Sequence, residues 1–334
     1  MRIPMRTTIL AAAGLVLVTA SAARGYPISP VTLWSLVERS EAIVYAEVFK
    51  VENHTCRSGE GIECKFSSTV ATLHVLETWK GPAAGEIQVP FPAGLICPAP
   101  PRYVKGAEVV AFLSRDKNRW MTVGLSYGTL YPDGSHELED LRAMTARAVS
   151  LQETKQVRKE DRVDWIVEAA ARPGTRWHGL YELEPAGDEV HFFYDRTGNR
   201  QSFALSPAQK ERIARGFVAN PPLDPTLTMT LRVLAGYRSA QVDRTTAAAI
   251  EGLLGETHLP YWLPAAMQLA LERFGDRQAT QKVNAIRKGC CEFDEAGARN
   301  LWRTAQQKLS IPSVAPLRPP VRRGVRGVGG NTPS

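Results

Sequence analysis

Residues 42–49 have the sequence Ala-Ile-Val-Tyr-Ala-Glu-Val-Phe, in which β-branched, aromatic and small apolar side chains surround a single acid. This composition is typical of a buried β-strand. The preceding segment, residues 32–40, carries Leu33, Leu36 and Val37 at the spacing of a short amphipathic helix. The folded part of the chain is therefore expected to begin with a short helix that leads into a buried strand.

More strands are predicted downstream, because short apolar runs alternate with turn-forming residues. Lys80-Gly81-Pro82 ends one such run, and Pro132-Asp133-Gly134 ends the last. The further strands are predicted over residues 66–79, 86–91, 109–113, 120–123 and 128–131. Five or six short strands in about 100 residues predict a small closed or half-closed barrel.

Beyond Gly134 the spacing of apolar residues becomes helical. Leu138, Leu141, Met144 and Ala148 form a helical stripe. Residues 206–209 (Ser-Pro-Ala-Gln) form a capping box with proline at the first helical position. Helices are predicted over residues 138–151, 161–171, 207–219, 225–237, 243–254, 261–274, 276–288 and 294–309. Their short connections are typical of stacked antiparallel helix pairs.

A small β insert is expected within this helical half. Residues 179–183 and 190–194 have the composition of two strands, and residues 196–199 have that of a turn. The whole sequence thus predicts an α+β fold, a small OB-like β-barrel followed by a mostly α-helical domain with the β insert. The predicted parts are a signal peptide (1–22), the barrel domain (30–135), the mainly helical domain (136–312) and a disordered Pro/Gly/Arg tail (313–334).

The first 22 residues have the order of a secretory signal peptide. Arg2 and Arg6 precede an apolar stretch over residues 7–20, and Ala20-Ser21-Ala22 offers small residues for cleavage after position 22. An uncleaved membrane anchor is the alternative, although the apolar stretch is short for a bilayer-crossing helix. Cleavage predicts an exported protein, periplasmic or extracellular, with no later transmembrane span.

The charge of the chain lies mainly at its two ends. The 334 residues carry 41 Lys and Arg against 34 Asp and Glu, a net charge of +7. Two of the positive charges lie in residues 1–22 and four in residues 313–334, which leaves about +1 on the rest. A nearly neutral body argues against nucleic-acid binding, whereas the arginine-rich tail favours weak contact with an anionic surface.

Export would permit disulfides, and three of the five cysteines are candidates for pairing. Cys56 and Cys64 flank a short Gly- and charge-rich stretch and form the leading pair, while Cys97 could instead bridge to either of them. No C-x-x-C motif occurs, so neither a thioredoxin-type site nor a zinc ribbon is indicated.

Motifs that carry known chemistry are missing from the sequence. It contains no G-x-S-x-G, no phosphate-binding Walker loop and no H-E-x-x-H. His136, Glu137, Glu139 and Asp140 could be metal ligands, but their place at a helix start favours acids that stabilise the macrodipole. We therefore predict no catalytic, cofactor-binding or metal-binding residue.

The densest group of functional side chains is Arg176, Trp177, His178 and Tyr181. Trp, Tyr and Arg dominate binding hot spots, so these residues are a candidate binding patch. The alternative is that Trp177 packs between the helices and the β insert while Arg176 pairs with an acid, because large aromatic residues usually serve cores.

Three segments carry a resemblance to a known family. Residues 37–48 (Val-Glu-Arg-Ser-Glu-Ala-Ile-Val-Tyr-Ala-Glu-Val) resemble the S-D-I-V-x-G-x-V opening of many bacterial exported proteins of unassigned role. Residues 75–81 (Val-Leu-Glu-Thr-Trp-Lys-Gly) resemble their V-x-x-x-W-K-G strand end, and residues 105–113 resemble their G-x-x-Y-L-V-F-L strand. Together they resemble a netrin-like OB-fold of the type found in tissue inhibitors of metalloproteinases.

This resemblance implies a netrin-like OB-fold over roughly residues 32–131. The metalloproteinase inhibitors chelate their target's zinc through an N-terminal cysteine, and a mature chain that begins near Ala23 has no cysteine there. The signal sequence, the pair of domains and the lack of catalytic motifs favour an exported, non-catalytic binding or structural protein that presents a surface to another exported or cell-envelope protein. The alternative is a secreted protease inhibitor or an uncharacterised hydrolase that uses the barrel loops.

Overall fold

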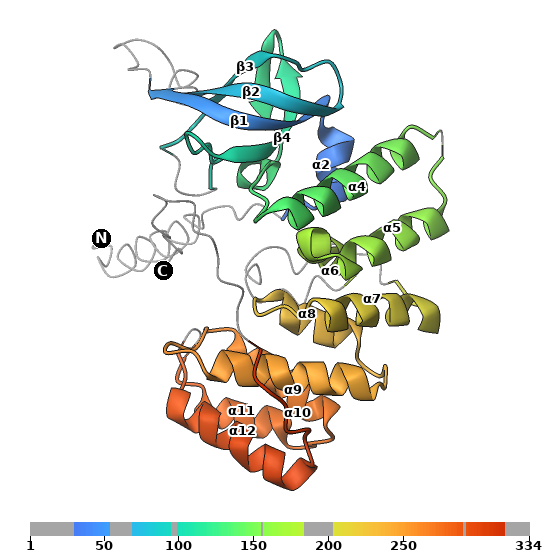
Figure 1. The fold of residues 1–334 in the computed structure, drawn as a ribbon, viewed down its shortest axis with the longest axis vertical. Helices are drawn as coiled ribbons and strands as arrows, with labels where there is room; N and C mark the ends of the chain where they lie inside the picture. The colour runs from blue at the N-terminus through green and yellow to red at the C-terminus, as the bar shows by residue number, and fades with distance from the viewer. Residues whose placement is uncertain are drawn as a thin grey trace, which may run out of the picture.

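The computed structural model describes residues 30–53, 69–94, 99–154, 156–183, 203–289 and 292–317. A β-barrel lies at one end of the molecule, and helices stack away from it in chain order (Figure 1). The predicted α+β class, with the barrel first and the helical region second, is confirmed. In the described part of the chain, no helix is long and apolar enough to cross a membrane.

The barrel is built from antiparallel strands, which one short helix precedes in the chain. Among the described residues, the strand order is β3-β2-β1-β4-β5, with β6 paired to β4. The end strands β3 and β5 lie against each other, so the barrel is nearly closed. The bounds are α2 (Leu33–Arg39), β1 (Ala42–Asn53), β2 (Thr69–Lys80), β3 (Glu86–Phe91), β4 (Glu108–Asp116), β5 (Arg119–Thr122), the 3-10 helix η1 (Leu125–Gly128) and β6 (Thr129–Leu130).

The first half of β1 is buried on both faces, which explains its unbroken apolar sequence. Val44 and Val48 lie in the barrel interior with residues from β2, β3 and β4. Ile43 and Tyr45 point the other way and share a second core with α2, α4 and α5, in which Trp165 is fully buried. Barrel and helices are therefore joined by a hydrophobic core to which both contribute.

Three β-bulges interrupt the pairing of β1 with β2, as far as these two described strands extend. The unpaired extra residue is Trp79 in the first bulge, Leu76 in the second and Phe49 in the third. All three are large and apolar. A bulge changes the direction of the side chain at the extra position, so the bulges decide where these three residues point.

The helices form a two-layer stack of hairpins. Helices α5, α7 and α9 are neighbours in one layer, while α6, α8 and α10 are neighbours in the other (Figure 1). One hydrophobic core runs through the stack. The bounds are α4 (Ser135–Gln152), α5 (Lys159–Ala171), the 3-10 helix η2 (Pro173–Thr175), α6 (Arg176–Leu183), α7 (Pro207–Ala219), α8 (Thr226–Val233), α9 (Ala240–Leu254), α10 (Leu263–Arg273), α11 (Ala279–Ile286) and α12 (Glu295–Leu309).

The strand predicted over residues 179–183 is wrong, because these residues belong to helix α6. Gly179 lets α6 lie against α5, since a Cβ at this position would be 2.2 Å from the backbone nitrogen of Ala170. The second predicted strand (190–194) and the turn (196–199) lie outside the described residues. The predicted capping box is confirmed, because Ser206 accepts a hydrogen bond from the Gln209 backbone nitrogen at the start of α7.

The chain is ordered beyond the predicted helical boundary at residue 312. The Leu317 backbone nitrogen donates to the Ala248 carbonyl at 3.1 Å, and Val314 packs against the helical core. Gly252 makes this approach possible, because a Cβ there would lie 2.2 Å from the Leu317 carbonyl oxygen. Residues 313–317 of the predicted tail therefore form part of the fold. The predicted signal peptide (1–22) and residues 318–334 lie outside the described residues.

Candidate functional site

The structure brings Arg176, Trp177, His178 and Tyr181 together on α6, between the barrel and the helical stack. Arg176 is buried, and its Nη2 donates to the carbonyl oxygens of Asn220 (2.7 Å) and Gly216 (3.4 Å) at the end of α7. Burial lowers the pKa of Arg176, whereas the nearby carboxylates of Asp224 and Asp140 oppose that shift. Among the described residues, the hydrogen-bond acceptors of Arg176 are thus carbonyls at a helix C-terminus, where a cation is favourable, and not an acid.

His178 joins α6 to the first helix of the chain. Its Nδ1 accepts a hydrogen bond of 3.0 Å from the backbone nitrogen of Leu33, in the first turn of α2. That nitrogen has no partner within its own helix, so the imidazole takes the place of an N-terminal cap. Burial lowers the pKa of His178 to about 4, which keeps the ring neutral and able to accept at neutral pH.

Trp177 connects the barrel to the same helix. Its ring stacks on Tyr127 of η1 with centroids 6.0 Å apart and on Tyr181 with centroids 5.1 Å apart. Tyr181 is buried and Trp177 is half-buried. Three of the four residues of the predicted patch are therefore buried, and their described contacts hold the barrel, α2, α6 and α7 together.

The acids at the start of α4 also bond within the chain. Glu137 accepts from the Asp133 backbone nitrogen at 2.8 Å, and Asp140 accepts from the Gly174 nitrogen at 3.0 Å. Asp140 also pairs with Arg172 at 3.1 Å. The described residues contain no group of three or more His, Cys, Asp or Glu that could hold a metal ion. The cysteines Cys56, Cys64 and Cys97 lie outside the described residues, so their predicted pairing stays a prediction.

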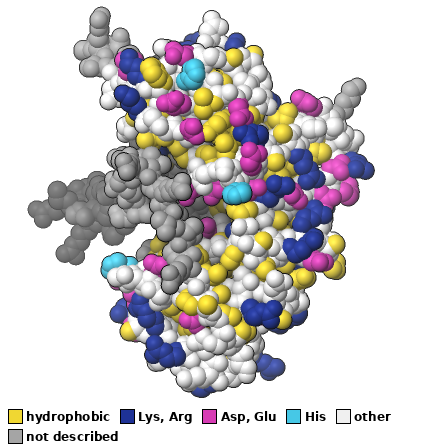
Figure 2. Space-filling model, viewed as in Figure 1, with side chains coloured by type: hydrophobic (Ala, Val, Ile, Leu, Met, Phe, Trp, Pro, Cys, Tyr) yellow, Lys and Arg dark blue, Asp and Glu magenta, His cyan; other side chains and the backbone are white. Residues whose placement is uncertain are grey.

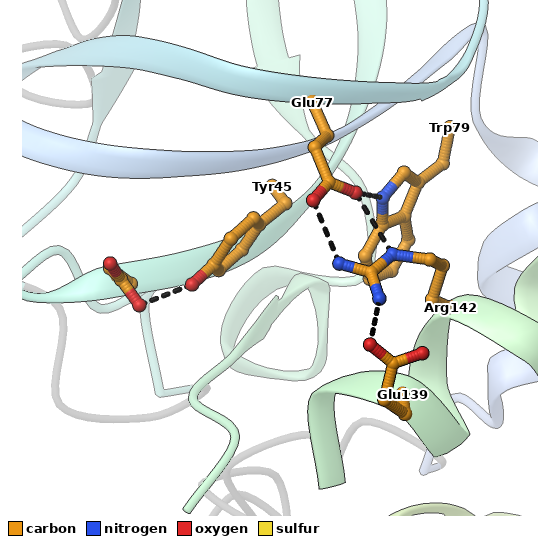
Figure 3. A network of polar contacts seen from close by, with 6 residues as sticks. Tyr45, Glu77, Trp79, Glu139 and Arg142 are labelled. Atoms are coloured by element: carbon orange, nitrogen blue, oxygen red, sulfur yellow. Dashed lines mark hydrogen bonds and ion pairs between the residues drawn. The ribbon is translucent and has the colours of Figure 1, made fainter. Parts of the chain in front are cut away.

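A polar network on the barrel surface, which the sequence did not indicate, holds α4 against β2 (Figure 3). Arg142 of α4 donates to both carboxylate oxygens of Glu77 at 2.7 and 2.9 Å, and it also pairs with Glu139. The Trp79 indole nitrogen donates to Glu77 at 2.9 Å. Hydrogen bonds from Arg142 and Trp79 lower the pKa of Glu77.

Tyr45 lies beside this network and extends it across the sheet. Its ring stacks on Trp79 with centroids 6.3 Å apart, and its hydroxyl donates to Glu108 of β4 (Figure 3). Burial and the hydrogen bond to Glu108 raise the pKa of Tyr45, so the phenol stays protonated at neutral pH. Tyr45 and the network mark the region where helix α4 covers the outer face of the sheet.

Beyond Tyr45 the same outer face lies open to solvent. Phe49 is 56% exposed and Leu76 is 44% exposed, and both are the extra residues of β-bulges. His74 and Glu47 are exposed between them and face each other across the two strands. Figure 2 shows hydrophobic side chains exposed among acids at the barrel end of the molecule. We call Glu47, Phe49, His74 and Leu76 the outer-strand patch.

The chain was compared with protein-family models, with curated proteins and with solved structures, and none of the three comparisons finds a match.

Proposed function

We propose that this chain is an exported, non-catalytic binding protein that presents the outer-strand patch to another exported or cell-envelope protein. The observation that carries the proposal is the exposure of Phe49 and Leu76 at two β-bulges. The order of charged, apolar and small residues over positions 1–22 supports export.

The bulges support a functional interpretation of these two side chains. A regular β1–β2 ladder would carry neither extra residue, and each bulge gives up regular pairing. The bulge at Trp79 gains a contact within the chain, because Trp79 bonds to Glu77 and stacks on Tyr45. Phe49 and Leu76 stay largely in solvent, where a large apolar side chain contributes most by being buried against a partner.

The surroundings of the patch suit a protein partner. By strand geometry Phe49 and Leu76 lie roughly 12 Å apart, a separation that one helix or one strand pair of a partner can span. Glu47 and His74 between them add polar groups that can fix the orientation of that partner. The sheet beneath is held by the barrel core on its inner face, so the patch is presented by a rigid element.

Site-specific photocrosslinking tests the proposal. A photoreactive phenylalanine analogue at position 49 or 76, in cells that produce the full chain, should give a discrete adduct of one size. Tyr261 is the matched control, because it is also 44% exposed but lies in the helical region. The adduct formed from position 49 should disappear in a Leu76→Ser background. Equal labelling at positions 49 and 261, or no adduct at 49 and 76, overturns the proposal.

A further inference from the structure

We infer that a pocket between α2 and the end of α4 binds a small zwitterion with an apolar body, in the class of the apolar α-amino acids. The pocket measures about 260 Å³. It lies at the junction of barrel and helices. Its lining consists of Trp34, Glu38, Lys80, Val149, Gln152, Glu153 and Val157.

The pocket presents both signs of charge. The Lys80 ammonium donates to the Val37 carbonyl oxygen at 2.8 Å, and it has no further hydrogen bond within the described chain. Glu38 and Glu153 are exposed at the rim, and neither has a salt-bridge partner among the described residues. Burial lowers the pKa of Lys80, while both carboxylates oppose that shift. The half-buried ammonium can bind a ligand carboxylate, and the two carboxylates, which form no salt bridge among the described residues, can bind a ligand ammonium.

An unsatisfied acceptor lies in the same wall. Gln152 donates from Nε2 to the Trp34 carbonyl oxygen at 3.0 Å, yet its buried Oε1 has no hydrogen-bond partner in the described residues. A buried acceptor without a donor costs free energy. The exposed carboxylate of Glu153, at the end of α4, therefore favours the ammonium end of the ligand on the α4 side.

The remaining wall of the pocket is apolar and rigid. Val149 and Val157 contribute aliphatic surface. Trp34 is held by an edge-to-face contact with Trp165, with centroids 5.2 Å apart, and by the Arg162 guanidinium 5.5 Å above its ring. The volume lies just below the roughly 300 to 1,000 Å³ of sites for drug-sized ligands, so a ligand of amino-acid size is favoured.

Calorimetric titration with three molecules of one shape tests the inference on the unmodified protein. Leucine carries both charges, isoamylamine carries only the ammonium and isocaproate carries only the carboxylate. Leucine should bind at one site per chain, and each single-charge analogue should bind weaker by about tenfold or more, because it leaves one charged partner unpaired. Comparable binding of all three molecules, or no heat with leucine at about 10 mM, overturns the inference.

Variants locate the site. Glu153→Gln should weaken leucine binding by about fivefold, and Lys80→Met by about tenfold, with Lys80→Arg restoring most of the affinity. Lys105→Met removes an exposed lysine elsewhere on the barrel and should leave binding unchanged. Because Lys80→Met also removes the bond to the Val37 carbonyl, its fold is checked by circular dichroism. If that variant does not fold, Glu153→Gln decides, and unchanged binding there contradicts the assignment.

Discussion

The imidazole of His178 accepts a 3.0 Å hydrogen bond from the backbone nitrogen of Leu33, across 145 residues of sequence. A neutral ring can accept this bond and a protonated ring cannot. The attachment of α2 to α6 therefore depends on the protonation state of one buried histidine.

The first prediction concerns the pH dependence of stability. Burial holds the pKa of His178 at about 4, against 6.5 for an exposed histidine. The unfolded state therefore binds the proton first as the pH falls, so the stability contribution is complete above about pH 6.5 and is lost toward pH 4. The free energy of unfolding should fall by on the order of 3 kcal/mol over this window through this residue alone.

The variant His178→Gln provides the comparison for that measurement. A glutamine carbonyl oxygen can still accept from the Leu33 nitrogen but does not titrate. Urea unfolding of both proteins between about pH 7 and pH 4 should show the smaller loss of stability in the variant. Identical losses in the two proteins would mean that His178 does not titrate as a buried group.

The second prediction concerns Gly81, at the end of the Trp-Lys-Gly sequence. Its φ is +74°, and a Cβ there would lie 2.0 Å from the Glu41 carbonyl oxygen. Gly81→Ala should lower the free energy of unfolding by about 3 kcal/mol through strain and displacement of the backbone. Gly85→Ala is the control, because φ there is +67° with no atom within 4 Å of a Cβ, so its cost should be about 1 kcal/mol. Equal costs would contradict the close approach of Gly81 to Glu41.

The third prediction concerns the ion pair of Arg142 with Glu77. The two side chains are 31% and 40% exposed, so solvent screens the pair despite its two parallel hydrogen bonds. A double-mutant cycle of Arg142→Met and Glu77→Gln should give a coupling energy of about 1 kcal/mol. The coupling should weaken in acid, because Glu77 has a lowered pKa and its contribution disappears once the carboxylate is protonated. Strict additivity of the two substitutions at neutral pH would exclude the pair as a stabilising contact.

The fourth prediction concerns the C-terminal segment. Removing residues 318–334 should leave the thermal midpoint unchanged, whereas removing residues 313–334 should lower it. The second truncation loses the hydrogen bond from Leu317 to Ala248 and the packing of Val314 and Leu317, together about 2 kcal/mol. Differential scanning calorimetry of the two truncated chains measures the difference. Equal midpoints would show that residues 313–317 do not contribute to stability.

Local sequence patterns predicted most of the elements but failed at α6. Residues 86–91 and 207–219 were predicted to the residue, because turn and capping residues bound each element. Residues 179–183 resembled a strand because Leu180 and Tyr181 follow a glycine. The close approach of α5, which Gly179 permits, is a tertiary contact that no local pattern contains.

The candidate site was less predictable than the elements, because it too depends on contacts between segments that are far apart in the sequence. The extra residues Phe49 and Leu76 are defined only by how β1 and β2 pair, which a single strand does not reveal. Glu77 and Arg142 are 65 residues apart and show no motif spacing. The sequence marks Arg176, Trp177, His178 and Tyr181 as a candidate binding patch, with packing of Trp177 as the alternative, and the structure shows their described contacts joining parts of the chain.

The two-faced burial of β1 has a consequence for biosynthesis. The barrel strands are synthesised before α4 and α5, which cover Ile43 and Tyr45 in the finished protein. A nascent barrel therefore carries an uncovered apolar face until residue 171 has been added, and it cannot reach its final stability as an independent unit. Cleavage or pausing in the α4–α5 region would leave an intermediate with this apolar face exposed, and such surfaces favour aggregation.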